Sequence, residues 1–243
     1  MSTNMIVNSL GTRLWELMKR SGAVWEYSYK GNLRAPHVVL RSGKHSNGFV
    51  DTLQYLSRVA NLSAAAEMLA RKLAGRLDGI RPDWIFGSPM AGIPFATEVA
   101  RSWEINRIGF NEKVGDKELI CRFDLSPGEK FLIVEEMTTT GGTPQRGIDA
   151  VLKKNPTAVA LPIVAAFLTR CGHRPTELQG RELISLVSLP ELNVEYSEWE
   201  PDNCPLCSSG STPISNCKRV WSDLLKTMMD DPPTSLFDTR PFS

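Results

Sequence analysis

The sequence predicts an α/β fold with a mainly parallel central sheet flanked by helices. Between residues 62 and 189, apolar runs typical of buried strands alternate with stretches whose apolar residues recur at helical spacing. This alternation favours right-handed crossovers, which place helices on both faces of one sheet. A chain of 243 residues is long enough for one large domain with a small appendage, which is the organisation we expect.

The individual elements follow from local patterns. Leu10, Leu14, Leu17 and Met18 recur at helical spacing after Ser9 and predict an opening amphipathic helix. Short apolar runs at 38–40 and 49–51 flank a turn-rich stretch and predict a hairpin or small sheet. In the core, we expect helices at 62–77, 93–103 and 143–153, and strands at 84–87, 107–110, 131–135, 158–168 and 183–189.

The chain is expected to have three segments. Residues 1–60 would form the N-terminal helix and a small N-terminal hood, and residues 61–190 the core. After Leu189 the composition shifts toward Pro, Ser, Cys and acidic residues, and helical periodicity returns only near 220–229. Residues 191–243 are therefore predicted to be a C-terminal appendage.

The composition excludes several classes of protein. A net charge of +1 gives no sign of a nucleic-acid partner. The longest apolar run, 158–168, is too short to span a bilayer, and no secretion signal is recognisable, so we expect a cytoplasmic protein that does not bind membranes. An odd number of cysteines, five, favours reduced thiols over a disulfide framework.

A predicted phosphate-binding turn follows the apolar strand that ends at Val134. Two acids, Glu135 and Glu136, lead through Met137 into Thr138-Thr139-Thr140-Gly141-Gly142-Thr143 and a predicted helix. A Gly-rich turn into a helix directs backbone N–H groups at a phosphate, and the acids are able to hold ribose hydroxyls or the water shell of Mg²⁺. The alternative is a solvated strand end followed by an ordinary turn.

This segment resembles the phosphoribosyl pyrophosphate (PRPP) motif of type I phosphoribosyltransferases. The resemblance implies the type I phosphoribosyltransferase fold, Mg²⁺ as cofactor, and a 5-phosphate held by Thr138, Thr139, Thr140, Gly141, Gly142 and Thr143. It assigns Glu135 and Glu136 to the ribose, with Glu136 also catalytic. Glu136 departs from the family pattern, which has Asp there, and the extra methylene displaces the carboxylate.

Within that family, other residues resemble orotate phosphoribosyltransferases. Leu40-Arg41-Ser42-Gly43-Lys44-His45-Ser46 is similar to a signature whose basic residue, here Arg41, binds PRPP. The resemblance implies that Phe49 covers the orotate ring and that Thr139 also binds orotate. Arg170 matches the position that reads the orotate carboxylate, which a guanidinium can bind bidentately. The alternative is that Arg41, Lys44 and Arg170 are solvated loop residues.

Two further segments complete the resemblance. Ser88, Met90, Ala91 and Gly92 lie in a loop similar to the family's pyrophosphate loop, although an ordinary strand-to-helix turn has the same Gly and Pro usage. Lys113 and Lys117 match lysines that act catalytically on the leaving pyrophosphate. Here the loop that carries them is expected at 110–118, it is shorter than in the family, and Glu112 replaces an arginine.

The implied activity is transfer of ribose 5-phosphate from PRPP to orotate, with release of pyrophosphate, in pyrimidine nucleotide biosynthesis. The resemblance also implies a homodimer. Two alternatives stay open: a PRPP- or nucleotide-binding regulatory protein with little turnover, favoured by Glu136 and the short loop, and a transferase for a different base.

Cys204-Pro205-Leu206-Cys207 is the pattern of a metal knuckle or a redox pair. A complete zinc site needs four ligands, and Cys217 is the candidate third, with Cys171 or His173 as a distant fourth. The alternative is a cysteine-containing loop without metal.

Overall fold

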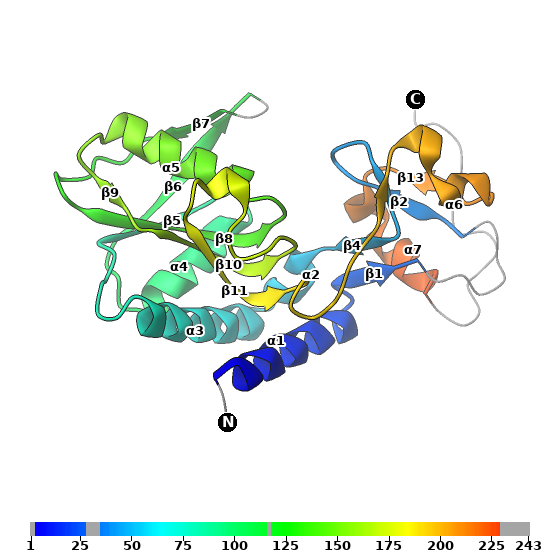
Figure 1. Ribbon diagram of the computed structural model, residues 1–243, viewed down its shortest axis with the longest axis horizontal. Helices are drawn as coiled ribbons and strands as arrows, with labels where there is room; N and C mark the ends of the chain where they lie inside the picture. The colour runs from blue at the N-terminus through cyan, green and yellow to red at the C-terminus, as the bar shows by residue number, and fades with distance from the viewer. Residues whose placement is uncertain (1–2, 28–34, 116–117, 229–243) are drawn as a thin grey trace. The chain divides into compact units, whose positions relative to one another are not determined.

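The computed structural model describes residues 3–27, 35–115 and 118–228 and divides into two compact units (Figure 1). Unit 1 comprises residues 1–17 and 55–194, and unit 2 comprises residues 18–54 and 195–243. Most of helix α1 (Thr3–Arg20) therefore belongs with the core. The hood segment and the C-terminal appendage, which the sequence suggested as separate segments, form one unit.

Unit 1 is built on the predicted sheet. Its strand order is β11-β10-β8-β5-β6-β7, with the short β9 also paired to β8. All these pairings are parallel except that of β7 with β6. The strands are β5 (Trp84–Gly87), β6 (Ile108–Val114), β7 (Glu118–Cys121), β8 (Lys130–Thr138), β9 (Val159–Ala160), β10 (Ile163–Thr169) and β11 (Glu182–Ser188).

One predicted strand is divided in the structure. The apolar run 158–168 was expected to be continuous, but β9 ends at Ala160 and β10 begins at Ile163. Pro162, which has no N–H to donate, lies in the gap, and a proline interrupts a strand for that reason. β8 pairs with both pieces, with β9 at its start and with β10 at its end.

Helices cover both faces of the sheet in unit 1, as predicted. α3 (Val59–Arg76) and α4 (Gly92–Ser102) pack on one face, and α5 (Gly142–Lys154) packs on the other (Figure 1). Two short helices, α2 (Thr52–Leu56) and η1 (Thr176–Leu178), complete the helices from 52 to 194. Among the described residues, no helix has both the length and the apolar character needed to cross a membrane.

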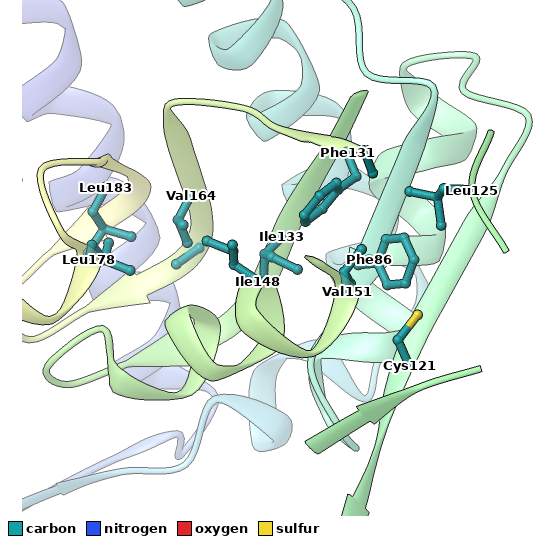
Figure 2. Close-up of a cluster of buried hydrophobic side chains, with 12 residues drawn as sticks. Phe86, Cys121, Leu125, Phe131, Ile133, Ile148, Val151, Val164, Leu178 and Leu183 are labelled. Carbon is teal, nitrogen blue, oxygen red and sulfur yellow. The ribbon is translucent and has the colours of Figure 1, made fainter. Parts of the chain in front are cut away.

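The core on the α5 side fixes this helix against the strand that precedes it. Figure 2 shows Ile133 of β8 meeting Ile148 and Val151 of α5, and all three side chains are buried. Burying each such side chain contributes about 1.5–3 kcal/mol. Asn111 of β6 adds a polar tie, since its Nδ2 donates to the Gly147 carbonyl at 3.1 Å. The start of α5 is thus held at the end of β8.

Unit 2 is a small assembly of short elements. β1 (Val24–Glu26) pairs antiparallel with β4 (Gly48–Val50), and a second sheet has the order β12-β3-β2-β13. Its core contains Trp25, Val38, Cys217, Trp221 and Leu224. The other elements are β2 (His37–Val39), β3 (His45–Ser46), β12 (Glu198–Trp199), η2 (Pro201–Asn203), α6 (Pro205–Ser208), β13 (Pro213–Ile214), η3 (Cys217–Val220) and α7 (Trp221–Lys226). α7 confirms the helix predicted near 220–229.

Candidate active site

Three predicted ligand-binding segments meet at one edge of the sheet in unit 1. β5, β8 and β10 are parallel neighbours, with Gly87 paired to Val134 and Thr138 paired to Thr169. Residues 88–91 follow β5, residues 139–141 follow β8, and Arg170 follows β10. In open α/β sheets, ligands bind beyond the carboxyl ends of the strands, so this edge is the candidate active site.

The phosphate turn depends on Gly141. Its φ is +88°, and a Cβ there would lie 2.9 Å from Cγ of Leu178. Glycine alone adopts such a left-handed conformation at little cost. The turn is also held by Thr138, whose buried Oγ1 accepts a hydrogen bond from the Gly141 N–H at 3.1 Å. Thr139 and Thr140 are exposed, so their hydroxyls are available to a ligand.

The positive end of α5 faces this turn. The first backbone N–H groups of a helix have no partner within it, and the helix dipole adds partial positive charge, which favours a phosphate. Arg146 reinforces the charge, since its Nη2 donates to Thr143 Oγ1 at 3.1 Å. Sequence reasoning missed Arg146, although its spacing of three residues from Thr143 places both on one helical face.

The acidic pair has two distinct environments. Glu135 is only 3% exposed, and its Oε1 has no hydrogen-bond partner among the described residues. Burial and the neighbouring Glu136 raise the pKa of Glu135 to about 8, against a hydrogen bond from Ser88 and the charge of Arg146. Glu136 is half-buried. A buried acceptor without a partner is costly, so Glu135 suits a ribose hydroxyl or a water molecule held by a cation.

The predicted pyrophosphate loop lies beside the acidic pair. Ser88 is buried, and its backbone N–H donates to the Val134 carbonyl at 3.3 Å. A Cβ on Gly92 would lie 3.2 Å from the same carbonyl oxygen, so glycine lets α4 begin close to β8. The Pro89–Met90 peptide bond is cis, and the Met90 side chain is 82% exposed. The loop therefore offers mainly backbone groups to a ligand.

The segment expected to be a loop at 110–118 is instead a β-hairpin. Asn111 to Val114 of β6 pair antiparallel with Glu118 to Cys121 of β7, and Gly115, with a φ of +61°, lets the chain turn after β6. Lys113 is exposed on this hairpin, and Lys117 lies outside the described residues. Glu112 forms an ion pair with Arg122 at 2.6 Å, so the acid that replaces the family's arginine is compensated by a cation that sequence reasoning missed.

The predicted ligand residues of unit 2 lie around the turn between β2 and β3. Arg41 and Ser42 are exposed, and Gly43 has a φ of +88°. The turn is closed by a hydrogen bond from the Leu40 N–H to the Lys44 carbonyl at 2.7 Å. Phe49 packs on Trp221, with ring centroids 5.7 Å apart. Binding of PRPP by Arg41 and of orotate by Phe49 stays a prediction.

The structure does not bring the other expected zinc ligands, Cys217, Cys171 and His173, to Cys204 and Cys207. Cys217 is buried and donates its thiol to the Ile214 carbonyl at 3.2 Å. Cys171 contacts the Thr169 hydroxyl, and His173 pairs with Glu191 at 2.7 Å. The spacing along the chain could not exclude these residues, because ligands of one site often come from segments far apart.

The fold and this edge of the sheet define the class of protein: the chain has the type I phosphoribosyltransferase fold. A similar fold occurs in the orotate phosphoribosyltransferase of Aeropyrum pernix, with a TM-score of 0.56 and 22% identity over 74% of this chain and 98% of that one. A phosphoribosyltransferase of Corynebacterium diphtheriae also matches, with a TM-score of 0.55 and 22% identity, over 76% of this chain and 99% of that one. No protein-family profile matches the sequence.

Relatives found by sequence identify the family within this fold class. The orotate phosphoribosyltransferase of Nitratiruptor sp. is 31% identical over 77% of this chain and 94% of its own length. That of Heliobacterium modesticaldum is 32% identical over 76% of this chain and 90% of its own length. The chain belongs to the orotate phosphoribosyltransferase family.

Proposed function

We propose that the chain transfers ribose 5-phosphate from PRPP to orotate and releases pyrophosphate, a step of pyrimidine nucleotide biosynthesis. The observation that carries this proposal is the convergence of the phosphate turn, the pyrophosphate loop and Arg170 at the ends of three adjacent parallel strands. Family membership supports the same activity.

The donor would bind across two helix starts. The N-terminus of α5, with Thr138 to Thr143 and Arg146, holds the 5-phosphate, and the backbone of Ser88 to Gly92 holds the pyrophosphate. Glu135 and Glu136 accept hydrogen bonds from the ribose hydroxyls. These groups orient the anomeric carbon and require no covalent chemistry from the protein. The transition state of the transfer reaction would resemble an oxocarbenium ion, by analogy with glycoside hydrolysis.

The acceptor would bind beside the phosphate turn. Arg170 follows β10 directly next to Thr138, where a guanidinium fork can bind the planar carboxylate of orotate. Thr139 is exposed and directly follows Thr138, the residue hydrogen-bonded to Arg170, so its hydroxyl would contact the base. An acidic pyrimidine fits this cationic position better than a purine without a carboxylate.

Mg²⁺ fits the acidic pair. The Oε1 atom of Glu135 is buried and has no partner among the described residues, and Glu136 lies next to it in the chain. The raised pKa keeps Glu135 protonated without a cation, and a cation nearby would favour its ionised, acceptor form. These two carboxylates would hold the ion through its water shell. When bound, Mg²⁺ neutralises charge on the departing pyrophosphate. Lys113 on the β6–β7 hairpin, together with Lys117, supplies further positive charge.

We also propose that the protein is a cytoplasmic homodimer. All five cysteines are free, which is usual in a reducing compartment. Residues 111–114 of β6 run past the end of its pairing with β5, and the exposed side chains of Lys113 and Val114 on this extension are the surface that a second copy would contact. Sedimentation of the purified protein tests the dimer.

The activity is tested by mixing the protein with PRPP, Mg²⁺ and orotate and following the loss of orotate absorbance. We expect turnover that requires all three components, and no turnover when uracil or adenine replaces orotate. Calorimetry of PRPP binding runs in parallel. PRPP binding without turnover on orotate would overturn the proposed activity and favour a regulatory role, whereas turnover on another base would overturn the acceptor assignment.

A further inference from the structure

Two buried histidines and two cysteines of unit 2 gather around one point. His37 lies in β2, His45 in β3, and Cys204 and Cys207 lie at the start of α6 and within it. One ligand atom from each of the four residues lies within 4.8 Å of the other three. Three of these side chains are buried and Cys207 is half-buried. Buried polar groups require partners, and these four side chains face one another.

The distances between these atoms match a tetrahedral metal site. With Zn–N near 2.0 Å and Zn–S near 2.3 Å, neighbouring ligand atoms of a tetrahedron lie about 3.3 to 3.8 Å apart. Cys207 Sγ is 3.5 Å from His37 Nε2 and 3.3 Å from His45 Nδ1. Cys204 Sγ is 3.6 Å from His37 Nε2, and the two imidazole nitrogens are 2.9 Å apart. Only small shifts would be needed to accommodate an ion.

A hydrogen-bond relay orients His37 for metal binding. The Ser211 hydroxyl donates to the carbonyl oxygen of Ala35, so it accepts from Nδ1 of His37, which lies 2.8 Å away. In a neutral imidazole with its proton on Nδ1, the lone pair of Nε2 is free to bind a metal. Nε2 is the atom that faces the two cysteines. Metal-bound histidines are usually held in this way by a partner on the other ring nitrogen.

We propose that His37, His45, Cys204 and Cys207 bind a structural Zn²⁺ ion. Two imidazole nitrogens and two thiolates form a frequent ligand set of structural zinc, and thiolates select zinc over hard cations such as Mg²⁺. The set supplies four protein ligands, so the ion has no open position for a substrate. Its role is therefore to hold unit 2 together.

The small core of unit 2 explains the need for such an ion. Among the described residues of this unit, one apolar cluster contains five buried residues, drawn from both chain segments. The ligands join the same two segments, since His37 and Cys204 are separated by 167 positions in the sequence. A small domain with little apolar area to bury usually needs a disulfide or a metal ion for stability. Because the cysteines form no disulfide, a metal ion is the stabilising element that we expect here.

The ion would also steady the turn that carries Arg41. His37 and His45 lie on the two strands that flank residues 40–44, so a bond from each to one ion closes the base of this turn. This second consequence rests on the proposed function and on the predicted binding of PRPP by Arg41. We expect metal removal to weaken PRPP binding and to lower the stability of unit 2.

The test uses the full chain purified under reducing conditions without an affinity tag that binds metal. Elemental analysis is expected to give about one zinc ion per chain. Cys207→Ser and His45→Gln should lower the zinc content at least several-fold. Cys217→Ser is the matched control, since it removes a buried cysteine of the same unit outside the cluster, and it should keep the zinc.

Cobalt substitution keeps the test decisive if a variant fails to fold. Wild-type protein reconstituted with Co²⁺ should show the intense visible bands of a tetrahedral site and the charge-transfer bands of thiolate ligands. Wild-type protein that holds no zinc and develops no such spectrum would overturn the proposal. A metal-bound protein without turnover on orotate would instead overturn the proposed function and leave the zinc site standing.

Discussion

The backbone N–H of Arg170 donates a hydrogen bond to the carbonyl oxygen of Thr138 at 3.0 Å. This contact joins the residue assigned to the orotate carboxylate to the first threonine of the phosphate turn. Because it is a backbone contact, it fixes the relative position of the two segments whatever the side chains do. A base held by Arg170 is thereby placed next to a ribose held by the acidic pair.

Arg170→Gln should impair orotate binding selectively. The substitution removes a charged donor pair worth about 1.5–3 kcal/mol, so the KM for orotate should rise roughly 10- to 100-fold. The Kd for PRPP should stay within about twofold, since the backbone contact to Thr138 is kept. Initial rates and calorimetry measure the two quantities. Arg174→Gln, an exposed arginine of the same unit, is the control, and equal effects of both variants would refute the assignment of Arg170.

Gly141→Ala should destabilise the protein and weaken PRPP binding together. A side chain at a φ of +88° is strained, and its Cβ would collide with Leu178, so we expect a loss of about 1–3 kcal/mol in the free energy of unfolding. Urea denaturation and PRPP calorimetry check this. Gly172→Ala is the control because a Cβ there meets nothing within 4 Å. Unchanged PRPP affinity in Gly141→Ala would remove the turn from the donor site.

The protein should lose stability as Glu135 ionises. Burial and Glu136 raise the pKa of Glu135 from 4.5 to about 8 in the folded state. Between these values the folded state binds a proton that the unfolded state lacks, so the free energy of unfolding falls as pH rises and levels off above the folded pKa. The side chain of Glu135→Gln is neutral at every pH, so this variant should not show the decrease in the free energy of unfolding with rising pH.

Urea denaturation at pH 5 and pH 9 compares the two proteins. The wild type should lose more stability than Glu135→Gln between these pH values. Glu177→Gln, at an exposed position of the same unit, should behave like the wild type. The same pH dependence in the wild type and Glu135→Gln would contradict a buried, protonated Glu135.

Lys113→Ala should slow turnover with little effect on orotate binding. Removing a donor that stabilises charge on a leaving group typically costs about 10²-fold in kcat. Steady-state rates with saturating PRPP measure kcat, and the KM for orotate should stay within about twofold. Lys130→Ala is the control, because Lys130 is exposed at the start of β8, opposite the carboxyl ends of the strands. Unchanged kcat in Lys113→Ala would exclude this lysine from leaving-group stabilisation.

The sequence was most informative where chemistry and local structure share a short segment. The run from Glu135 to Thr143 predicted the strand-to-helix turn that the structure shows, because a left-handed glycine and a helix N-terminus leave a local signature, and its phosphate binding stays a prediction. Arg122 and Arg146 were missed because nothing local distinguishes them from solvated arginines. Their significance comes from Glu112 and Thr143, which they contact in the folded chain.

The sequence by itself determined the alternation of strands and helices, the phosphate turn and the family. These features follow from the spacing of apolar residues and from motifs of consecutive residues. Only the tertiary structure showed that His37 and His45 lie beside Cys204 and Cys207, since these histidines lie more than 150 positions away and the nearer Cys217 faces other groups. A metal site requires several ligand atoms within a few ångströms of one point, and the separation of residues along the chain does not predict how close their side chains lie in space.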